Sequence, residues 1–294
     1  MEKRIIIAGG TGFIGSYLKT RFLELGFEVL VVSRDGGDVT WIHEDLVDAL
    51  ERASVVINLA GATINCRHTY QNKALILQSR IDTTNAIGQA LLSCKRVPSL
   101  WVNASASAVY IPSLSKEMTE SETELADGFL ADVVKQWEYT FFSYYLQDTR
   151  QIALRTSVVL GGDGGALETL MKLTQYGLGG IQGSGQQLIS WIHVEDYFRI
   201  LFFLIDQSSL SGVVNCSAPQ PSSNKVFMQT LRNVLRVPIG IPAPSFGIKI
   251  GARLIGTEPE LILDSCNMVP QKLIDSGFEF KYPELKNALE DLVF

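Results

Sequence analysis

The sequence predicts an α/β protein built on a doubly wound parallel sheet, with a smaller C-terminal α/β lobe. Short apolar segments alternate with segments of helical periodicity through residues 4–155. This alternation is typical of a parallel sheet covered by helices on both faces. A glycine-rich turn also joins the first apolar segment to the first helical one, as in a βαβ unit.

The first unit is the most regular part of the chain. Arg4–Ala8 is apolar and β-branched and predicts a buried strand. Apolar residues between positions 18 and 25 then repeat at near-helical spacing, and Phe27–Val32 predicts the second strand. Strand, glycine turn, helix and strand thus follow one another within about 30 residues, the length of a βαβ unit.

Further elements continue the alternation. We expect strands at Ser54–Gly61, Leu100–Ser105 and Arg150–Arg155, and helices at Ser79–Ser93 and Val133–Tyr145. In such sheets the ligand lies beyond the carboxyl ends of the strands. The segments expected to line one crevice there are Gly10–Gly15, Ser33–Arg34, Ala60–Gly61 and Ser105–Ser107.

The turn itself has the spacing G-x-x-G-x-x-G, with glycines at Gly9, Gly12 and Gly15. Backbone amides in such a turn, together with the positive end of the following helix, form a pyrophosphate site. Gly9 permits the tight turn, Gly12 a close backbone approach and Gly15 close packing of helix on strand. The alternative is an ordinary glycine turn in a parallel-sheet protein. The predicted cofactor-binding residues are Gly9, Thr11, Gly12, Phe13, Ile14, Gly15, Ser33, Arg34, Leu59, Ala60, Gly61 and Arg80.

The end of the second strand indicates which nicotinamide cofactor is bound. A carboxylate about 20 residues past the turn usually binds the adenosine ribose. Here Ser33 and Arg34 occupy that position, and a guanidinium is suited to a 2′-phosphate. This favours NADP(H) over NAD(H). The neighbouring Asp35 leaves open that Arg34 is a solvated loop residue.

Composition excludes several classes of function. The net charge is −6 without a long Lys/Arg cluster, so we expect no nucleic-acid partner. No apolar run approaches the ~20 residues that span a bilayer, and no secretory signal precedes the first strand. The four scattered cysteines predict neither a metal site nor a disulfide and favour the cytoplasm.

We expect two structural units. Residues 1–160 form the NADP-binding unit of Rossmann type, which 190–218 rejoins, and residues 161–189 and 219–294 form the smaller substrate lobe. Glycine-rich stretches and clustered prolines mark the second unit.

The chain also resembles a known family over nearly its whole length. The motifs that carry the resemblance are Gly9–Gly15, Val56–Gly61, Ser79–Ile81, Ser105–Val109, Asp127–Ala131, Trp137–Glu138, Leu154–Thr156, Val159–Leu167, Gly183–Gly185, Ser190–Asp196, Pro270–Leu273, Gly277–Phe278 and Phe280. They are similar to the atypical or extended short-chain dehydrogenases/reductases, in the epimerase-like subfamily with an extra C-terminal domain. Members are sometimes labelled nucleoside-diphosphate-sugar epimerase or cell-division inhibitor.

The superfamily's chemistry uses a Tyr-x-x-x-Lys pair on one helix, in which the lysine depresses the tyrosine pKa. Matching through Glu138 puts these positions at Leu130 and Val134, which cannot transfer a proton. The candidate catalytic residues are therefore Ser105, Ser107, Tyr110 and His193.

Each candidate has a structural alternative. The serines bind a substrate carbonyl or are ordinary turn residues, and Tyr110 departs from the family's usual loop. His193 is an acid/base or a structural residue satisfied by backbone, with Asp196 capping a helix. Lys135 and Tyr139 fit a surface lysine and a packed tyrosine.

Other polar residues suggest further roles. Arg67, His68 and Arg80 are candidates to meet an anionic substrate, and Arg155 is expected in a buried ion pair. The acidic run 116–127 fits a solvated loop or a lid at the active-site entrance.

These observations lead to a functional hypothesis. The chain is predicted to be an NADP(H)-dependent oxidoreductase or epimerase-like enzyme acting on a small polar or nucleotide-sugar substrate. The alternatives are a non-catalytic NADP(H)-binding sensor or regulator and a protein-interaction module. Family resemblance further implies a homodimer formed through helices that include Val133–Tyr145.

Overall fold

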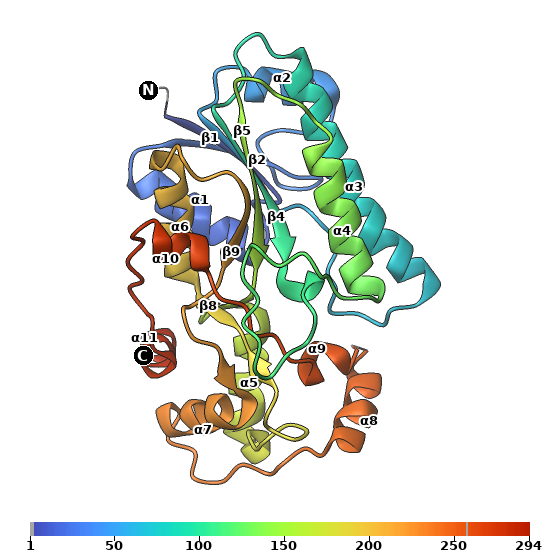
Figure 1. Cartoon of the computed structure of the whole chain (residues 1–294), viewed down its shortest axis with the longest axis vertical. Coiled ribbons are helices and arrows are strands. Elements are labelled where there is room, and N and C mark those ends of the chain that lie inside the picture. Colours follow the sequence, from blue (N-terminus) through green and yellow to red (C-terminus); the bar gives the residue numbers. More distant parts are fainter. Residues whose placement is uncertain (1–2, 257) are drawn as a thin grey trace.

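The computed structural model describes residues 3–256 and 258–294, and its centre is a six-stranded sheet in the order β2-β1-β3-β4-β5-β9. Its strands are β1 (Arg4–Ala8), β2 (Glu28–Val32), β3 (Val55–Asn58), β4 (Leu100–Ala106), β5 (Arg150–Thr156) and β9 (Gly212–Cys216). All neighbours in the sheet are parallel (Figure 1). The predicted doubly wound parallel sheet is confirmed.

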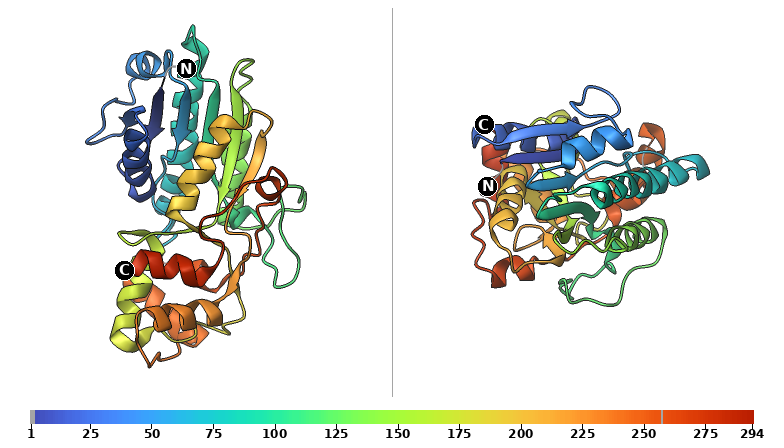
Figure 2. Two further views of the ribbon diagram at one scale, coloured as in Figure 1. Left: turned by 90° about the vertical axis from the view of Figure 1, so that its left-hand side faces the viewer. Right: turned by 90° about the horizontal axis from the view of Figure 1, so that it is seen from above.

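Helices cover both faces of this sheet (Figure 2). On one face lie α1 (Phe13–Glu24) and α6 (Val194–Asp206), and on the other α2 (His43–Leu50), α3 (Tyr70–Ser93) and α4 (Phe129–Phe142). Side chains of a strand alternate between its faces. Ile5 and Ile7 of β1 accordingly join the core under α1 and α6, whereas Ile6 and Ala8 join the core under the other three helices.

Two helices begin earlier than the sequence pattern predicts. The expected helix Ser79–Ser93 begins at Tyr70, because the Thr69 side chain caps it by accepting a hydrogen bond from the Asn72 amide at 3.3 Å. Most residues of its first turns are exposed, so apolar periodicity gave no sign of them. The expected helix Val133–Tyr145 begins at Phe129 and ends at Phe142.

A second apolar core lies below the sheet in Figure 1. It joins buried residues of α5 (Gly165–Leu173), α7 (Asn224–Val234) and α11 (Leu285–Val293) around Trp191. Two short two-stranded sheets adjoin it: β6 (Val158–Leu160) with β8 (Trp191–His193), and β7 (Leu188–Ile189) with β10 (Ser222–Ser223). The remaining elements are η1 (Ser107–Val109), η2 (Thr174–Leu178), α8 (Ser245–Ile255), α9 (Glu260–Leu263) and α10 (Gln271–Asp275).

The C-terminal segment contributes to both cores. Leu273 and Phe278 are buried in the core beneath α1 and α6, whereas Leu285 and Leu289 are buried in the lower core. The two regions are thereby connected by packing as well as by the chain. Among the described residues, no helix combines the length and apolar character that crossing a membrane requires.

Candidate cofactor and substrate site

The glycine turn lies between the carboxyl ends of β1 and β2. Gly9 has φ +77°, which favours glycine, and its amide donates to the Val32 carbonyl at 2.9 Å. A Cβ on Gly15 would lie 2.5 Å from the Gly10 Cα, so this glycine allows close packing, as expected. Its neighbour is the turn, however, and not the strand itself.

Gly12 differs from the other two glycines of the motif. Its φ of −77° suits any residue, and an added Cβ would meet only the Gly9 carbonyl oxygen, at 3.4 Å. No side chain caps the N-terminus of α1 at this position. Neither backbone conformation nor packing within the described chain requires a glycine here. What Gly12 provides is an uncovered surface of amides at a helix N-terminus, the arrangement that binds phosphate groups.

Three of the four predicted crevice segments, the glycine turn, the loop at Ser33 and the turn at Ala60, meet at one edge of the sheet. The Leu59 amide donates to the Ala8 carbonyl at 2.8 Å, and the hydroxyls of Thr11 and Ser33 lie 3.3 Å apart. A Cβ on Gly9 would touch the Ala60 amide nitrogen at 2.9 Å. This edge is the point where strand order reverses, between β1 and β3, and open α/β sheets bind ligands there.

The loop after β2 holds Ser33 and Arg34 beside the turn. It folds back on its own strand: the Val31 amide donates to the Asp38 carboxylate at 2.9 Å, and the Ser33 amide donates to the Val39 carbonyl at 3.3 Å. The Arg34 side chain is exposed and has no partner in the part of the chain that the structure describes. The loop therefore presents an unpaired guanidinium at the end of the second strand.

Phe13 and Ile14, both predicted to bind cofactor, turn their side chains toward protein. The Phe13 ring lies against the second glycine loop, where a Cβ on Gly161 or Gly164 would approach it to 2.4 or 2.7 Å. Ile14 packs against the apolar core. What these two residues can offer a ligand is their backbone.

Arg80 lies behind the loop that follows β3. Its guanidinium donates to the carbonyls of Ala62 at 3.0 Å and Ile76 at 2.8 Å and lies over the Trp137 ring. A Cβ on Gly61 would lie 3.1 Å from the Arg80 Cζ. Burial lowers the pKa of Arg80 to about 10. The arginine supports the Ala60–Ala62 turn from below.

Two of the candidate catalytic hydroxyls belong to one buried network. The Ser105 hydroxyl donates to Glu138 at 2.6 Å, and Arg155 binds both oxygens of that carboxylate at 2.8 Å. The Tyr110 hydroxyl donates to Asn215 at 2.7 Å and accepts from Arg155 at 2.9 Å. The expected ion pair of Arg155 is confirmed. Burial raises the Tyr110 pKa, so the phenolate form that could accept a proton is scarce.

His193 is 2% exposed and serves as a helix cap. Its Nδ1 accepts a hydrogen bond from the α6 backbone two residues on, at 3.0 Å, and its Nε2 lies 3.3 Å from the Asp291 carboxylate. Its ring also stacks on Tyr282. Burial lowers the His193 pKa to about 4. The expectation that Asp196 caps the helix is wrong, because its carboxylate accepts from the amides of residues 281 and 282.

The positions of the superfamily's Tyr-x-x-x-Lys pair hold no acid or base. Val134 is buried in an apolar cluster with Tyr110. Lys135 lies within 4 Å of two carboxylates, and Tyr139 is 80% exposed, so the expectation of a packed tyrosine is wrong. Ser107 remains: it is half-buried on η1, just beyond β4, and its hydroxyl lies beside the Cys266 thiol, whose pKa burial raises.

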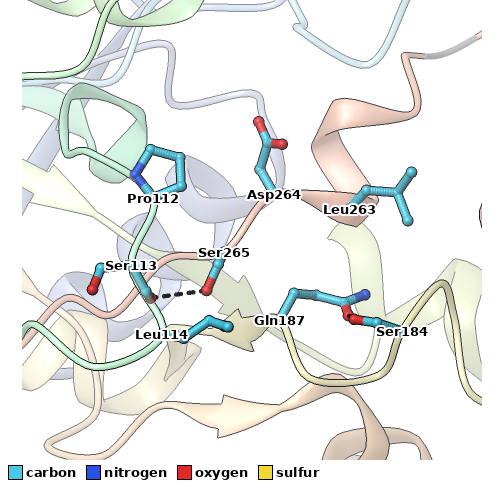
Figure 3. A pocket seen from close by; sticks show the side chains of 8 residues that line it. All are labelled: Pro112, Ser113, Leu114, Ser184, Gln187, Leu263, Asp264 and Ser265. Atoms are coloured by element: carbon cyan, nitrogen blue, oxygen red, sulfur yellow. Dashed lines mark hydrogen bonds between the residues drawn. The ribbon is translucent and has the colours of Figure 1, made fainter.

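A cavity of about 320 Å³ opens beyond Ser107, between the sheet and the lower lobe. Its lining residues are Pro112, Ser113, Leu114, Ser184, Gln187, Leu263, Asp264 and Ser265 (Figure 3). The Ser265 hydroxyl donates to the Ser113 carbonyl at 3.0 Å and so joins two walls. Cys266, the next residue, connects this wall to Ser107.

The acidic run 116–127 is fixed beside this cavity. The Met118 amide donates to the Asn267 carbonyl at 2.8 Å, and Glu120 accepts from the Asn215 amide at 2.9 Å. Met118 is 2% exposed. The run is therefore anchored at Met118 and Glu120, whereas half of its residues are exposed, as a solvated loop predicts.

With this geometry in place, comparison with known proteins defines the class. Residues 5–217 match the model of the NAD dependent epimerase/dehydratase family, and residues 243–292 match a domain of unknown function, DUF1731. An epimerase family protein of Staphylococcus aureus (strain bovine RF122 / ET3-1) is 35% identical over 300 residues, and one of Staphylococcus saprophyticus is 36% identical over 299. Each alignment covers 99% of both chains.

Solved structures agree. The human epimerase family protein SDR39U1 (isoform 2), crystallised with NADPH, has a TM-score of 0.91 and 32% identity over 99% of both chains. A nucleoside-diphosphate sugar epimerase of Corynebacterium glutamicum has a TM-score of 0.79 and 26% identity, covering 100% of this chain and 58% of that one. This chain belongs to the NAD dependent epimerase/dehydratase family and has its NAD(P)-binding fold of Rossmann type.

Proposed function

We propose that the protein binds NADP(H) and acts as an oxidoreductase or epimerase-like enzyme on a small polar or nucleotide-sugar substrate, without a Tyr-x-x-x-Lys pair. The observation that carries the cofactor assignment is Gly12. It is a glycine that the protein's own backbone and packing do not need, at an uncapped helix N-terminus. A glycine is needed at this position if a ligand phosphate approaches the backbone amides, because a side chain would block that approach.

Ser33 and Arg34 support the phosphorylated cofactor over NAD(H). Neither residue 33 nor residue 34 has a carboxylate that could accept hydrogen bonds from the ribose hydroxyls of NAD(H). The unpaired Arg34 guanidinium is suited to the 2′-phosphate of NADP(H). Asp35, the nearest acid in the chain, meets Ser33 through backbone atoms. The presence of NADPH in the crystals of the human relative agrees with this assignment.

A bound nicotinamide supplies or accepts hydride at its C4 atom. The proton must come from elsewhere. Ser105 and Tyr110 hydrogen-bond to other side chains, and His193 accepts from a backbone amide. The Ser107 hydroxyl meets the Cys266 thiol, a weaker hydrogen-bond partner, so Ser107 is the candidate that can exchange its partner for a substrate oxygen. We assign Ser107 this role, with water as the final proton source or acceptor.

Calorimetry with NADPH and NADH, followed by NADPH consumption at 340 nm across carbonyl compounds and sugar nucleotides, tests the proposal. We expect NADPH to bind at least tenfold more tightly than NADH, and at least one compound to oxidise it. The Ser107→Ala variant should keep cofactor affinity and lose turnover. Absence of heat with both cofactors would refute the cofactor assignment.

One observation favours a second candidate, a non-catalytic NADP(H)-binding sensor or regulator. Three of the four candidate acid/base groups are held in structural bonds, and the pair used by the superfamily is absent. Tight NADPH binding with neither NADPH consumption nor chemical conversion of any compound across the whole panel would support this candidate over the enzyme, because an epimerase regenerates its cofactor. The four free, scattered cysteines favour a reducing compartment such as the cytoplasm for either function.

A further inference from the structure

The cavity beyond Ser107 has a composition that restricts the substrate, granted the proposed function. None of its eight lining residues is Lys, Arg or His, and its one ionisable group is Asp264. Figure 3 shows Asp264 between Pro112 and Leu263, its carboxylate directed away from Ser265. Proteins that bind phosphate or carboxylate groups meet them with guanidinium, ammonium or amide donors. This cavity meets a ligand with hydroxyls, an amide and a carboxylate.

Two cations that could meet an anionic ligand are paired, and a third lies outside the lining. Arg67, a candidate for an anionic substrate, lies 3.3 Å from Glu258, whose carboxylate also accepts from the His68 amide at 2.6 Å. The Lys116 ammonium lies 2.7 Å from Glu122. Lys225 approaches Gly185 through its Cβ and is exposed. An anionic ligand in the cavity would have to form an ion pair with Lys225.

One strong hydrogen-bond acceptor among the lining residues, the Asp264 carboxylate, has no partner in the described chain. The hydroxyls of Ser113, Ser184 and Ser265 each accept from a backbone amide. The backbone amide of Asp264 donates to the Glu260 carbonyl at 3.0 Å, but its exposed carboxylate has no hydrogen-bond partner within the described chain. Burial, aided by Glu260, raises the pKa of the Asp264 carboxyl. A ligand whose hydroxyls donate to this carboxylate relieves that cost.

Cavity size points the same way. A water molecule's share of liquid volume is about 30 Å³, so about 320 Å³ corresponds to roughly ten waters. That is the scale of a monosaccharide and the lower end of the range for small-molecule pockets. A nucleoside diphosphate sugar is several times larger.

We propose that this cavity takes an uncharged polyhydroxyl molecule of monosaccharide size as substrate, and that Asp264 is the residue that rejects phosphorylated and nucleotide-linked forms. The specificity follows from charge, because an anionic group brought beside an ionised carboxylate is repelled.

Ligand-observed NMR on the NADP-loaded protein tests this with matched probes: glucose, galactose and mannose, their 6-phosphates, and UDP-glucose. We expect saturation transfer to at least one free sugar and at least tenfold weaker binding of its phosphate. Asp264→Asn should reduce that discrimination at least tenfold, and Asp264→Lys should reverse it. Lys225→Gln is the control and should leave it unchanged.

Three results would overturn the inference: no free sugar binds, a phosphate or UDP-glucose binds as tightly as the free sugar, or discrimination is lost in Lys225→Gln and kept in Asp264→Asn. Thermal unfolding of each variant shows whether it is folded. NADPH calorimetry on the same samples separates the two proposals. Loss of cofactor binding refutes the proposed function, whereas intact cofactor binding without sugar discrimination refutes only the assignment of this cavity.

Discussion

Adding one methyl group should reduce the stability of the fold at Gly15 and the affinity for NADPH at Gly12. The Gly15→Ala Cβ would lie 2.5 Å from the Gly10 Cα and 2.6 Å from the Gly9 carbonyl oxygen, both backbone atoms of a tight turn. Overpacking of this kind costs about 3 kcal/mol at the upper end, and alanine's helix propensity returns about 1 kcal/mol. The net loss of about 2 kcal/mol lowers the unfolding temperature by about 4–8 °C.

Gly12→Ala meets no such obstacle, because the nearest atom to its Cβ lies at 3.4 Å. Alanine is a poorer N-cap than glycine, so we expect a loss below about 1 kcal/mol. The methyl group stands where a ligand phosphate would approach the amides, and NADPH affinity should fall at least tenfold, about 1.4 kcal/mol.

Thermal unfolding with and without NADPH measures both effects. At a concentration 100 times Kd, a ligand stabilises the wild type by about 2.7 kcal/mol, and Gly12→Ala should lose about half of this gain at the same concentration. Gly15→Ala should start from a lower unfolding temperature. If Gly12→Ala is as destabilised as Gly15→Ala, or keeps its NADPH affinity within twofold, the reasoning about the turn is refuted.

Four further predictions follow from single contacts. Arg34→Ala should weaken NADPH binding at least tenfold and leave NADH binding unchanged by calorimetry, since the guanidinium would meet only the 2′-phosphate; equal losses for both cofactors would contradict it. Glu138→Ala leaves Arg155, with a side chain 6% exposed, unpaired, and should cost about 3–5 kcal/mol in urea unfolding, whereas a loss below 1 kcal/mol would show the pair to be dispensable. His193 has a folded pKa of about 4, below its ordinary 6.5, so the unfolded chain binds more protons between these two pH values. The free energy of unfolding should therefore fall by up to about 3 kcal/mol as the pH drops from 6.5 to 4. His193→Asn, which keeps a capping oxygen, should lose this pH dependence in urea titrations, and an unchanged dependence would assign it to other groups. Tyr139 and Tyr145 are 80% and 87% exposed on and just beyond α4. Light scattering should find a homodimer of the 32.4-kDa chain that the double variant Tyr139→Glu/Tyr145→Glu converts to monomer, whereas a monomeric wild type would exclude this interface.

The sheet and the glycine turn were predictable because their signals are local. A β-branched run such as Arg4–Ala8 and a helix with spaced apolar residues depend on neighbours a few positions away. The crevice follows from topology, since residues just past parallel strands meet at one edge. By contrast, most residues of α3 between positions 70 and 78 are exposed, and the cap at Thr69 marks its start.

The roles of the polar candidates were not predictable because their partners are distant in sequence. Tyr110 meets Asn215 at a separation of 105 residues, and His193 meets Asp291 on the last helix. Sequence motifs used Glu138 as a neighbour of Trp137 and as a point of alignment, without a sign that Ser105 and Arg155 share it. Periodicity locates a residue on an element, and it cannot say which distant group that residue will meet.

The network under the crevice suggests how a site without the Tyr–Lys pair stays ordered. Glu138 on α4 joins Ser105 of β4 to Arg155 of β5, and Tyr110 extends the network to Asn215 of β9. A buried ion pair gains little net stability after its desolvation cost. Its effect here is geometric, because the ion pair and its hydrogen-bond partners tie the ends of β4, β5 and β9 to α4. Ser105 and Tyr110 therefore act as scaffold, and under the proposed function Ser107 holds the substrate oxygen while water supplies or accepts the proton.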